Sequence, residues 1–335
     1  MATSGSYDYS VTASDIINKA LTDIQVLKNG ETVDNDDLTT ALVSLNLMTK
    51  EWMGKPGYAP GLKRWTRKLG YLFLRQNKGI YAIGTIANGG DYCCIGNYTQ
   101  GTLTASAAGG ASTVAVSLMY ASPTYTTATA PSATDYIGVV LDSGDIHWTI
   151  APAGAISLPG NIGLTVVLPS AASLGNYVFS FTVATQSGLP LDVLTCMRRD
   201  STAAVAIDFQ MDKMGDIYEY EQIPNKNITS TPVSWWYQMG LSTGSLYINC
   251  VPAVITNVLR MTFLYPIDDE DVVSNTMAFP QQWYGALRWA LAKDLAPGFG
   301  KSWTQTMEEN LGAAMSSAAN VDPDMTYQYF QPGRE

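Results

Sequence analysis

The sequence predicts an α+β fold, with helices near both ends and antiparallel β-strands between them. Two observations carry this prediction. Apolar residues recur at helical spacing near both termini, and short runs rich in Thr, Ser and Val, separated by turn residues, fill the middle. In addition, no Lys or Arg occurs from Gly79 to Met197. A length of 335 residues suggests roughly two domains.

Two helices are predicted at the start of the chain. The first begins near Ser14 and carries an apolar stripe that runs to Leu27, with Gly30 as its stop signal. The second follows Asp34-Asn35, and Gly54 and Pro56 end it. Because the loop between them is short, we expect an antiparallel hairpin of helices that buries one shared stripe.

The middle of the chain predicts antiparallel strands. The segment 96–187 carries short apolar runs, among them 113–117, 165–168 and 177–183, with turn signals every 8 to 15 residues. This pattern is typical of a β-sandwich or barrel. The clearest hairpin spans 136–150, with Asp142-Ser143-Gly144 as its turn. A second β region is expected over 191–265.

Two further helices are predicted after Pro280. One carries a stripe from Trp283 to Leu295, and the other runs from about Ser302 towards Asn320. Helices at both ends with strands between them must meet to close one core. We therefore expect a helical core built from the N- and C-terminal helices.

Composition excludes several classes of protein. A single His (His147) leaves no material for a multi-His metal site, and the four cysteines form no C-x-x-C pair. We expect no metal and no cofactor, and we expect reduced, buried thiols. The start has no signal-peptide pattern and no long apolar run occurs, so no secretion and no membrane span are expected. The net charge of −10 disfavours broad neutralisation of DNA phosphates.

Six segments, in this order, resemble the head-to-tail connector proteins of short-tailed bacteriophages, also called tail accessory or packaged-DNA stabilisation proteins. They cover both ends and roughly half of the chain, and are 13–24, 38–52, 61–74, 223–238, 246–252 and 279–300. The resemblance implies a discontinuous connector core, 1–95 and 188–335. Segment 96–187 is then an inserted β domain, which the smallest members of the family lack.

The resemblance also implies partners. Such proteins form a ring of identical subunits, here expected to be twelve, that docks under the portal protein and offers a surface to the next tail or nozzle protein. Genomic DNA then passes through the ring without sequence-specific binding, and the protein resides in the virion after synthesis in the host cytoplasm. By position, the expected portal-binding residues are Trp303, Met307, Leu311, Tyr327, Tyr329 and Phe330.

The main basic cluster predicts a contact with DNA or with a partner. It consists of Lys63, Arg64, Arg67 and Lys68, with Arg75 and Lys78 nearby. The alternative is a solvated loop that offsets the acidic helices before it. Trp65, within the cluster, is expected to anchor a core.

No motif predicts catalysis. His147 lies near Asp142 and Asp145 but has no nucleophile motif beside it. The acidic run 268–271 could hold calcium, although a charged turn explains it better. The sequence therefore predicts a non-enzymatic virion protein whose acidic channel lets DNA slide. A receptor- or glycan-binding tail component, with 235–237 as an aromatic platform, and a cell-wall hydrolase are the alternatives.

Overall fold

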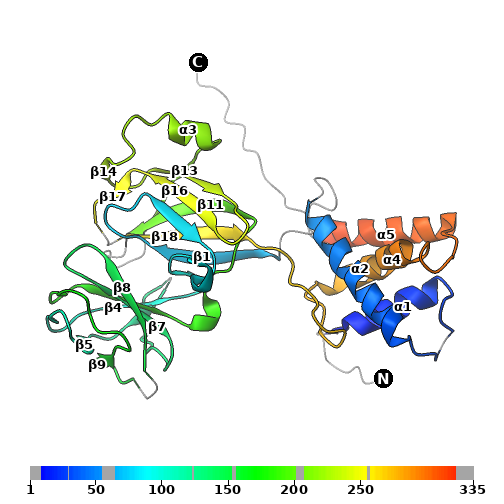
Figure 1. Ribbon diagram of the computed structural model, residues 1–335, viewed down its shortest axis with the longest axis horizontal. Coiled ribbons are helices and arrows are strands. Elements are labelled where there is room, and N and C mark those ends of the chain that lie inside the picture. The colour runs from blue at the N-terminus through cyan, green and yellow to red at the C-terminus, as the bar shows by residue number, and fades with distance from the viewer. Residues whose placement is uncertain are drawn as a thin grey trace. The chain divides into compact units, whose positions relative to one another are not determined.

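The computed structural model describes residues 9–28, 30–54, 65–122, 124–152, 156–200, 207–254 and 257–321 (Figure 1). The chain divides into two compact units. The helical unit comprises residues 1–66 and 266–335, and the β unit comprises residues 67–265. The predicted α+β class is confirmed, because helices occur near both chain ends and mostly antiparallel sheets lie between them in sequence.

The helical unit is built around its third long helix. Its elements are α1 (Ala13–Asp23), α2 (Asn35–Gly54), the 3₁₀ helix η4 (Gln281–Trp283), α4 (Tyr284–Leu295) and α5 (Gln305–Val321). Helix α4 contacts α1, α2 and α5. Trp283, which is fully buried, lies between Trp52 of α2 and Trp65, with ring centroids 6.2 and 6.0 Å away. Segments more than 200 residues apart in sequence therefore share one apolar centre.

The helix boundaries differ from the predicted ones at two points. Helix α1 ends at Asp23, one turn before the predicted end, because Ile24 caps it and Gln25 turns into the left-handed region with φ of 59°. Helix α5 begins at Gln305 rather than near Ser302. There the Thr304 hydroxyl accepts a hydrogen bond from the Met307 amide, so the helix begins just after this residue.

The β unit contains three larger sheets, all of them open. The first has the strand order β12 (Ile207–Gln210), β11 (Asp192–Asp200), β18 (Asn257–Leu264), β1 (Arg67–Phe73), β3 (Cys93–Ile95). The second has the order β6 (Tyr120–Ala121), β4 (Thr99–Thr102), β10 (Tyr177–Phe181), β7 (Tyr136–Val140), β8 (Ile146–Ile150). The third has the order β13 (Asp212–Lys213), β15 (Ser234–Gln238), β16 (Gly244–Asn249), β2 (Ile80–Ile83).

Smaller elements complete this unit. They are the pairs β5 (Thr113–Val116) with β9 (Gly160–Gly163) and β14 (Thr229–Ser230) with β17 (Val251–Pro252), the short helix α3 (Ile217–Glu221), and the 3₁₀ helices η2 (Ile86–Asn88) and η3 (Val183–Thr185). The β14–β17 and β13–β15 pairs are parallel, and the other named strand pairs are antiparallel.

The three sheets share buried layers because side chains alternate along each strand. Leu72 of β1 packs with Trp235 of β15 in a core between the first and third sheets. Its neighbour Phe73 points to the opposite face and packs with Phe179 and Phe181 of β10, in the second sheet. The first sheet thus has a buried core on each face.

Segment 96–187 forms sheets of its own, yet it shares the aromatic layer around Phe73 with the first sheet. For this reason the compact unit extends over 67–265, and the predicted boundaries at 95/96 and 187/188 stay a prediction. The hairpin of β7 and β8 has its turn at the predicted residues. The predicted strand over 165–168 is wrong: Val166 is held beside β8 by the side chains of His147 and Thr149, not by a strand ladder.

All four cysteines are free. Cys93, Cys94 and Cys196 are buried, as the sequence predicts, whereas Cys250 is only half-buried. Burial raises the pKa of the Cys93 thiol to about 12, so this thiol is protonated at neutral pH. Among the described helices, none combines the length and the apolar character needed to cross a bilayer.

Candidate partner-binding surfaces

The predicted portal-binding residues at the start of α5 are held against α4. Trp303 is half-buried and lies edge-on to Trp289 of α4, with ring centroids 6.3 Å apart. Its indole Nε1 donates a 2.7 Å hydrogen bond to Glu308, which also accepts hydrogen bonds of 2.7 and 2.9 Å from Lys293 of α4. The Lys293 ammonium and the indole N–H lower the pKa of Glu308. This corner of the helical unit therefore keeps a fixed anionic carboxylate between two donors at neutral pH.

A groove lies between α2, α4 and α5, and it contains one of the predicted residues. Its cavity volume is about 360 Å³, and its lining is Met48, Glu51, Trp52, Ala290, Lys293, Asp294, Pro297, Leu311 and Met315. Leu311 is a predicted site residue, whereas Trp303 and Met307 lie outside the lining, although both are half-buried. Tyr327, Tyr329 and Phe330 lie outside the described residues.

The lining of the groove combines apolar and charged side chains, so it suits an apolar side chain of a partner. Two methionines and one tryptophan supply polarizable apolar surface, and charged side chains from α2 and α4 line it as well. Sequence analysis missed the walls that α2 and α4 contribute. Met48 and Trp52 lie on the second predicted helix and are buried, but the sequence does not reveal that a recess remains beside them.

The predicted basic cluster is only partly described. Lys63 and Arg64 lie outside the described residues. Arg67 and Lys68 are exposed at the start of β1, and the Lys68 ammonium lies 5.4 Å from the centre of the Tyr265 ring. Trp65 packs with Phe279 and Trp283, at 5.7 and 6.0 Å, as expected of a core anchor.

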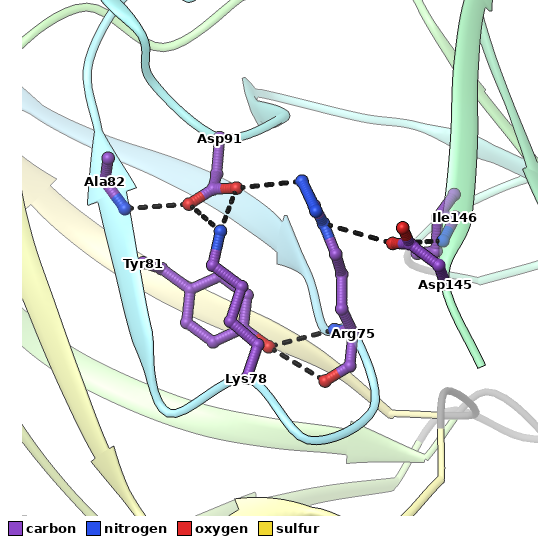
Figure 2. A network of polar contacts seen from close by, with 7 residues as sticks. All are labelled: Arg75, Lys78, Tyr81, Ala82, Asp91, Asp145 and Ile146. Carbon is purple, nitrogen blue, oxygen red and sulfur yellow. Dashed lines mark hydrogen bonds and ion pairs between the residues drawn. The ribbon is translucent and has the colours of Figure 1, made fainter. Parts of the chain in front are cut away.

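The two nearby bases are engaged inside the β unit, as Figure 2 shows. Lys78 donates hydrogen bonds of 2.6 and 2.8 Å to the buried Asp91 carboxylate. Arg75 lies between Asp91, at 3.3 Å, and Asp145, at 3.5 Å. The Tyr81 hydroxyl donates to the Arg75 carbonyl and accepts from the Arg75 amide, which fixes the turn between β1 and β2. These two bases therefore pair with carboxylates of the β unit.

The acidic run 268–271 is held against α2 in the helical unit. Glu270 is buried, and the side chain of Asn46 on α2 both donates to its carbonyl and accepts from its amide, at 3.0 Å each. Burial raises the pKa of the Glu270 carboxyl. Lys50 of α2 pairs with Asp269. Within the described residues, no group of three or more His, Cys, Asp or Glu side chains is arranged to hold a metal ion.

The aromatic triplet 235–237 divides between two faces. Trp235 and Tyr237 are buried in the core between the first and third sheets. Trp236 lies half-buried on the other face, beside Tyr247 at 5.4 Å. His147 is half-buried, and its Nε2 lies 3.0 Å from the Val166 carbonyl oxygen.

No protein-family model matches the chain, and no curated protein matches it. Among solved structures, it aligns with a complex of VP16 and VP17, the two major capsid proteins of bacteriophage P23-77. The alignment has 11% sequence identity and a TM-score of 0.14, and covers 64% of this chain and 77% of that chain. A TM-score this low supports no conclusion about fold or function.

Proposed function

We propose that this protein is a non-enzymatic structural component of a phage virion, a head-to-tail adaptor that forms a ring under the portal. The ring would complete the head, extend the DNA channel and present the attachment surface for the tail. The observation that carries the proposal is the ordered set of six sequence segments that resemble the connector family.

The positions of these segments in the fold support the proposal. Segments 13–24, 38–52 and 279–300 form α1, α2 and α4, which contact one another although they come from opposite ends of the chain. The other three segments contribute Leu72, Trp235 and Leu246 to a single buried core. The resembling residues are thus the ones that build the helical unit and the centre of the β unit, as expected where a resemblance reflects a shared fold.

In this proposal the portal contact is made by α5 and the groove beside it. Leu311 and Met315 line the groove, while the bond between Trp303 and Glu308 fixes the start of the helix against α4. A groove lined by apolar and charged side chains can bury one or two apolar anchors of a partner, and a few such anchors carry most of the binding energy in protein interfaces.

The charge of the chain supports a channel that does not hold DNA. The net charge is −10, and no base occurs between Gly79 and Met197. A wall that lacks Lys and Arg releases few counterions from DNA, so binding is weak and DNA can slide. We expect the lumen of the assembled ring to be acidic, and a basic lumen would contradict this part of the proposal.

Co-assembly with a portal ring tests the proposed function. The purified chain is mixed with the portal ring of the same phage, and the mass of the product is measured by native mass spectrometry. We expect a complex carrying a full ring of this chain. Leu311→Asp should weaken the association at least about tenfold, since it places a charge in an apolar contact. Leu174→Asp, at a side chain 64% exposed in the β unit, is the matched control and should bind normally. A wild-type chain that fails to associate would contradict the proposal.

A glycan-binding role is the second candidate, and one observation favours it. Trp236 and Tyr247 lie beside each other on the outer face of the third sheet, where a sugar ring could stack. Clear hits on a glycan array that Trp236→Ala abolishes would support this role over the adaptor.

A further inference from the structure

The groove between α2, α4 and α5 is a recess of the helical unit with a partly apolar lining. Its apolar lining includes Met48, Trp52, Pro297, Leu311 and Met315. Leu311 and Met315 come from α5 itself, so the helix that forms one wall is also the helix that ends at Val321. Whatever follows α5 in the chain therefore starts close to the groove.

The size and chemistry of the groove fit an aromatic side chain. Its volume of about 360 Å³ exceeds the volume of one aromatic side chain. Thioethers contact aromatic rings favourably, and unbranched methionine side chains adapt to the shape of a ring. The charged groups Glu51, Lys293 and Asp294 lie in the lining as well and can pair with the hydroxyl of a tyrosine or with backbone groups.

The chain carries such side chains immediately after α5. Residues 322–335 lie outside the described residues, and their sequence contains Tyr327, Tyr329 and Phe330. Along α5, Met315 lies about 9 Å before Val321, at 1.5 Å per residue. Six to nine residues of chain span at most about 20–32 Å when fully extended, so the groove lies within reach of the aromatic residues.

We propose that the aromatic segment Tyr327–Phe330 binds in this groove of its own chain. The short tether gives the segment a local concentration of the order of millimolar, so even a weak contact is occupied within one molecule. This inference does not rest on the proposed function, because it concerns the isolated chain. It changes how that function is tested, since a partner that uses the groove must first displace the segment.

Photo-cross-linking of the full-length chain tests the proposal. The photoreactive residue p-benzoylphenylalanine replaces Tyr327, Tyr329 or Phe330, one at a time, and the products are mapped by mass spectrometry. We expect at least one position to form cross-links within the chain to Met48, Trp52, Leu311 or Met315, with a yield independent of protein concentration. Absence of groove cross-links from all three positions would overturn the proposal. Cross-links between chains that grow with concentration would also overturn it, since a second copy would then hold the segment.

The same residue placed at Tyr9 is the matched control. Tyr9 is 70% exposed in the helical unit, and its ring centroid lies 6.5 Å from that of Tyr284. The photoreactive residue there should therefore label the start of α4 and not the groove. A second measurement does not depend on the fit of the photoreactive group. In the variant Tyr327→Ser, Tyr329→Ser, Phe330→Ser, amide hydrogen exchange over 311–319 should be at least about threefold faster than in the wild type. An unchanged exchange rate would contradict the proposal.

Discussion

Two aspartates of the β unit each hold more than one base. Asp91 is 8% exposed and accepts hydrogen bonds from Lys78, Arg75 and the Ala82 amide. Asp208 accepts hydrogen bonds of 2.7 and 2.8 Å from Arg199, which is 3% exposed, and one of 3.2 Å from Arg260. A buried charge without its partner destabilises the fold. Removal of either aspartate should therefore lower the free energy of unfolding, because its bases lose their counter-charge.

Asp91→Asn is expected to lower the free energy of unfolding by about 2 kcal/mol. Asparagine can still accept from the Ala82 amide, but it removes the charge that Lys78 and Arg75 share. Those bases are about one third exposed and regain some hydration, which keeps the loss moderate. Asp145→Asn, at a carboxylate 55% exposed, is the control and should cost less than about 0.5 kcal/mol. Urea denaturation measures both, and equal losses would contradict the assignment.

Asp208 predicts a specific pH dependence. The Arg199 guanidinium lowers the pKa of Asp208 below its ordinary value of about 3.9. An acid whose pKa is lower in the folded state contributes stability above its unfolded pKa, and loses that contribution as the pH falls through the folded pKa. At neutral pH, Asp208→Asn should destabilise the protein by about 3 kcal/mol, because Arg199 stays buried without its partner. The difference between wild type and variant should shrink below about pH 4. A difference that stays constant down to pH 2.5 would contradict this account.

At the scale of elements, the features predicted correctly are those that depend on residues close together in the sequence. The extent of α2 and the turn of the β7–β8 hairpin follow from local patterns, and both were predicted correctly. The end of α1 was not, because Leu27 continues the stripe while the chain has already turned at Gln25. The groove escaped prediction for a related reason. A sequence shows that Trp52 and Leu311 face inward, but not that their helices leave a recess between them.

Helix α5 predicts a stabilising substitution. Gly312 is exposed within the helix, and a Cβ atom there would meet nothing within 4 Å. Gly312→Ala should therefore raise the free energy of unfolding of the helical unit by about 0.5–1 kcal/mol, since alanine loses less backbone entropy in a helix. Gly70→Ala in β1 is the opposite case. Its Cβ would lie 2.5 Å from the Phe263 ring and 2.6 Å from the Cys94 carbonyl oxygen, so about 2 kcal/mol or more of destabilisation is expected. Thermal unfolding of both variants checks the pair, and a destabilised Gly312→Ala would contradict it.

At the scale of the whole molecule, the sequence indicated that the chain ends belong together but not how the middle is layered. Segments 13–24 and 279–300 each resemble the same protein family, which suggested that they share a unit, and α1 does contact α4. The order of strands in the sheets has no such signal. Phe73 and Phe179 are 106 positions apart, and only the packed structure shows that they meet across two sheets. Long-range pairing of this kind is set by how apolar faces can be buried jointly, which no local window contains.

The division into two units predicts that each loses its structure separately. Trp283 is fully buried in the helical unit, between Trp52 and Trp65, so Trp283→Ala should destabilise that unit by about 3–5 kcal/mol. Phe179, fully buried in the β unit, provides the reciprocal variant Phe179→Ala. Because each unit has its own buried core, hydrogen exchange should accelerate over α1, α2 and α4 in the first variant and over β1, β7 and β10 in the second. If either substitution accelerated exchange equally in both units, they would form one cooperative structure.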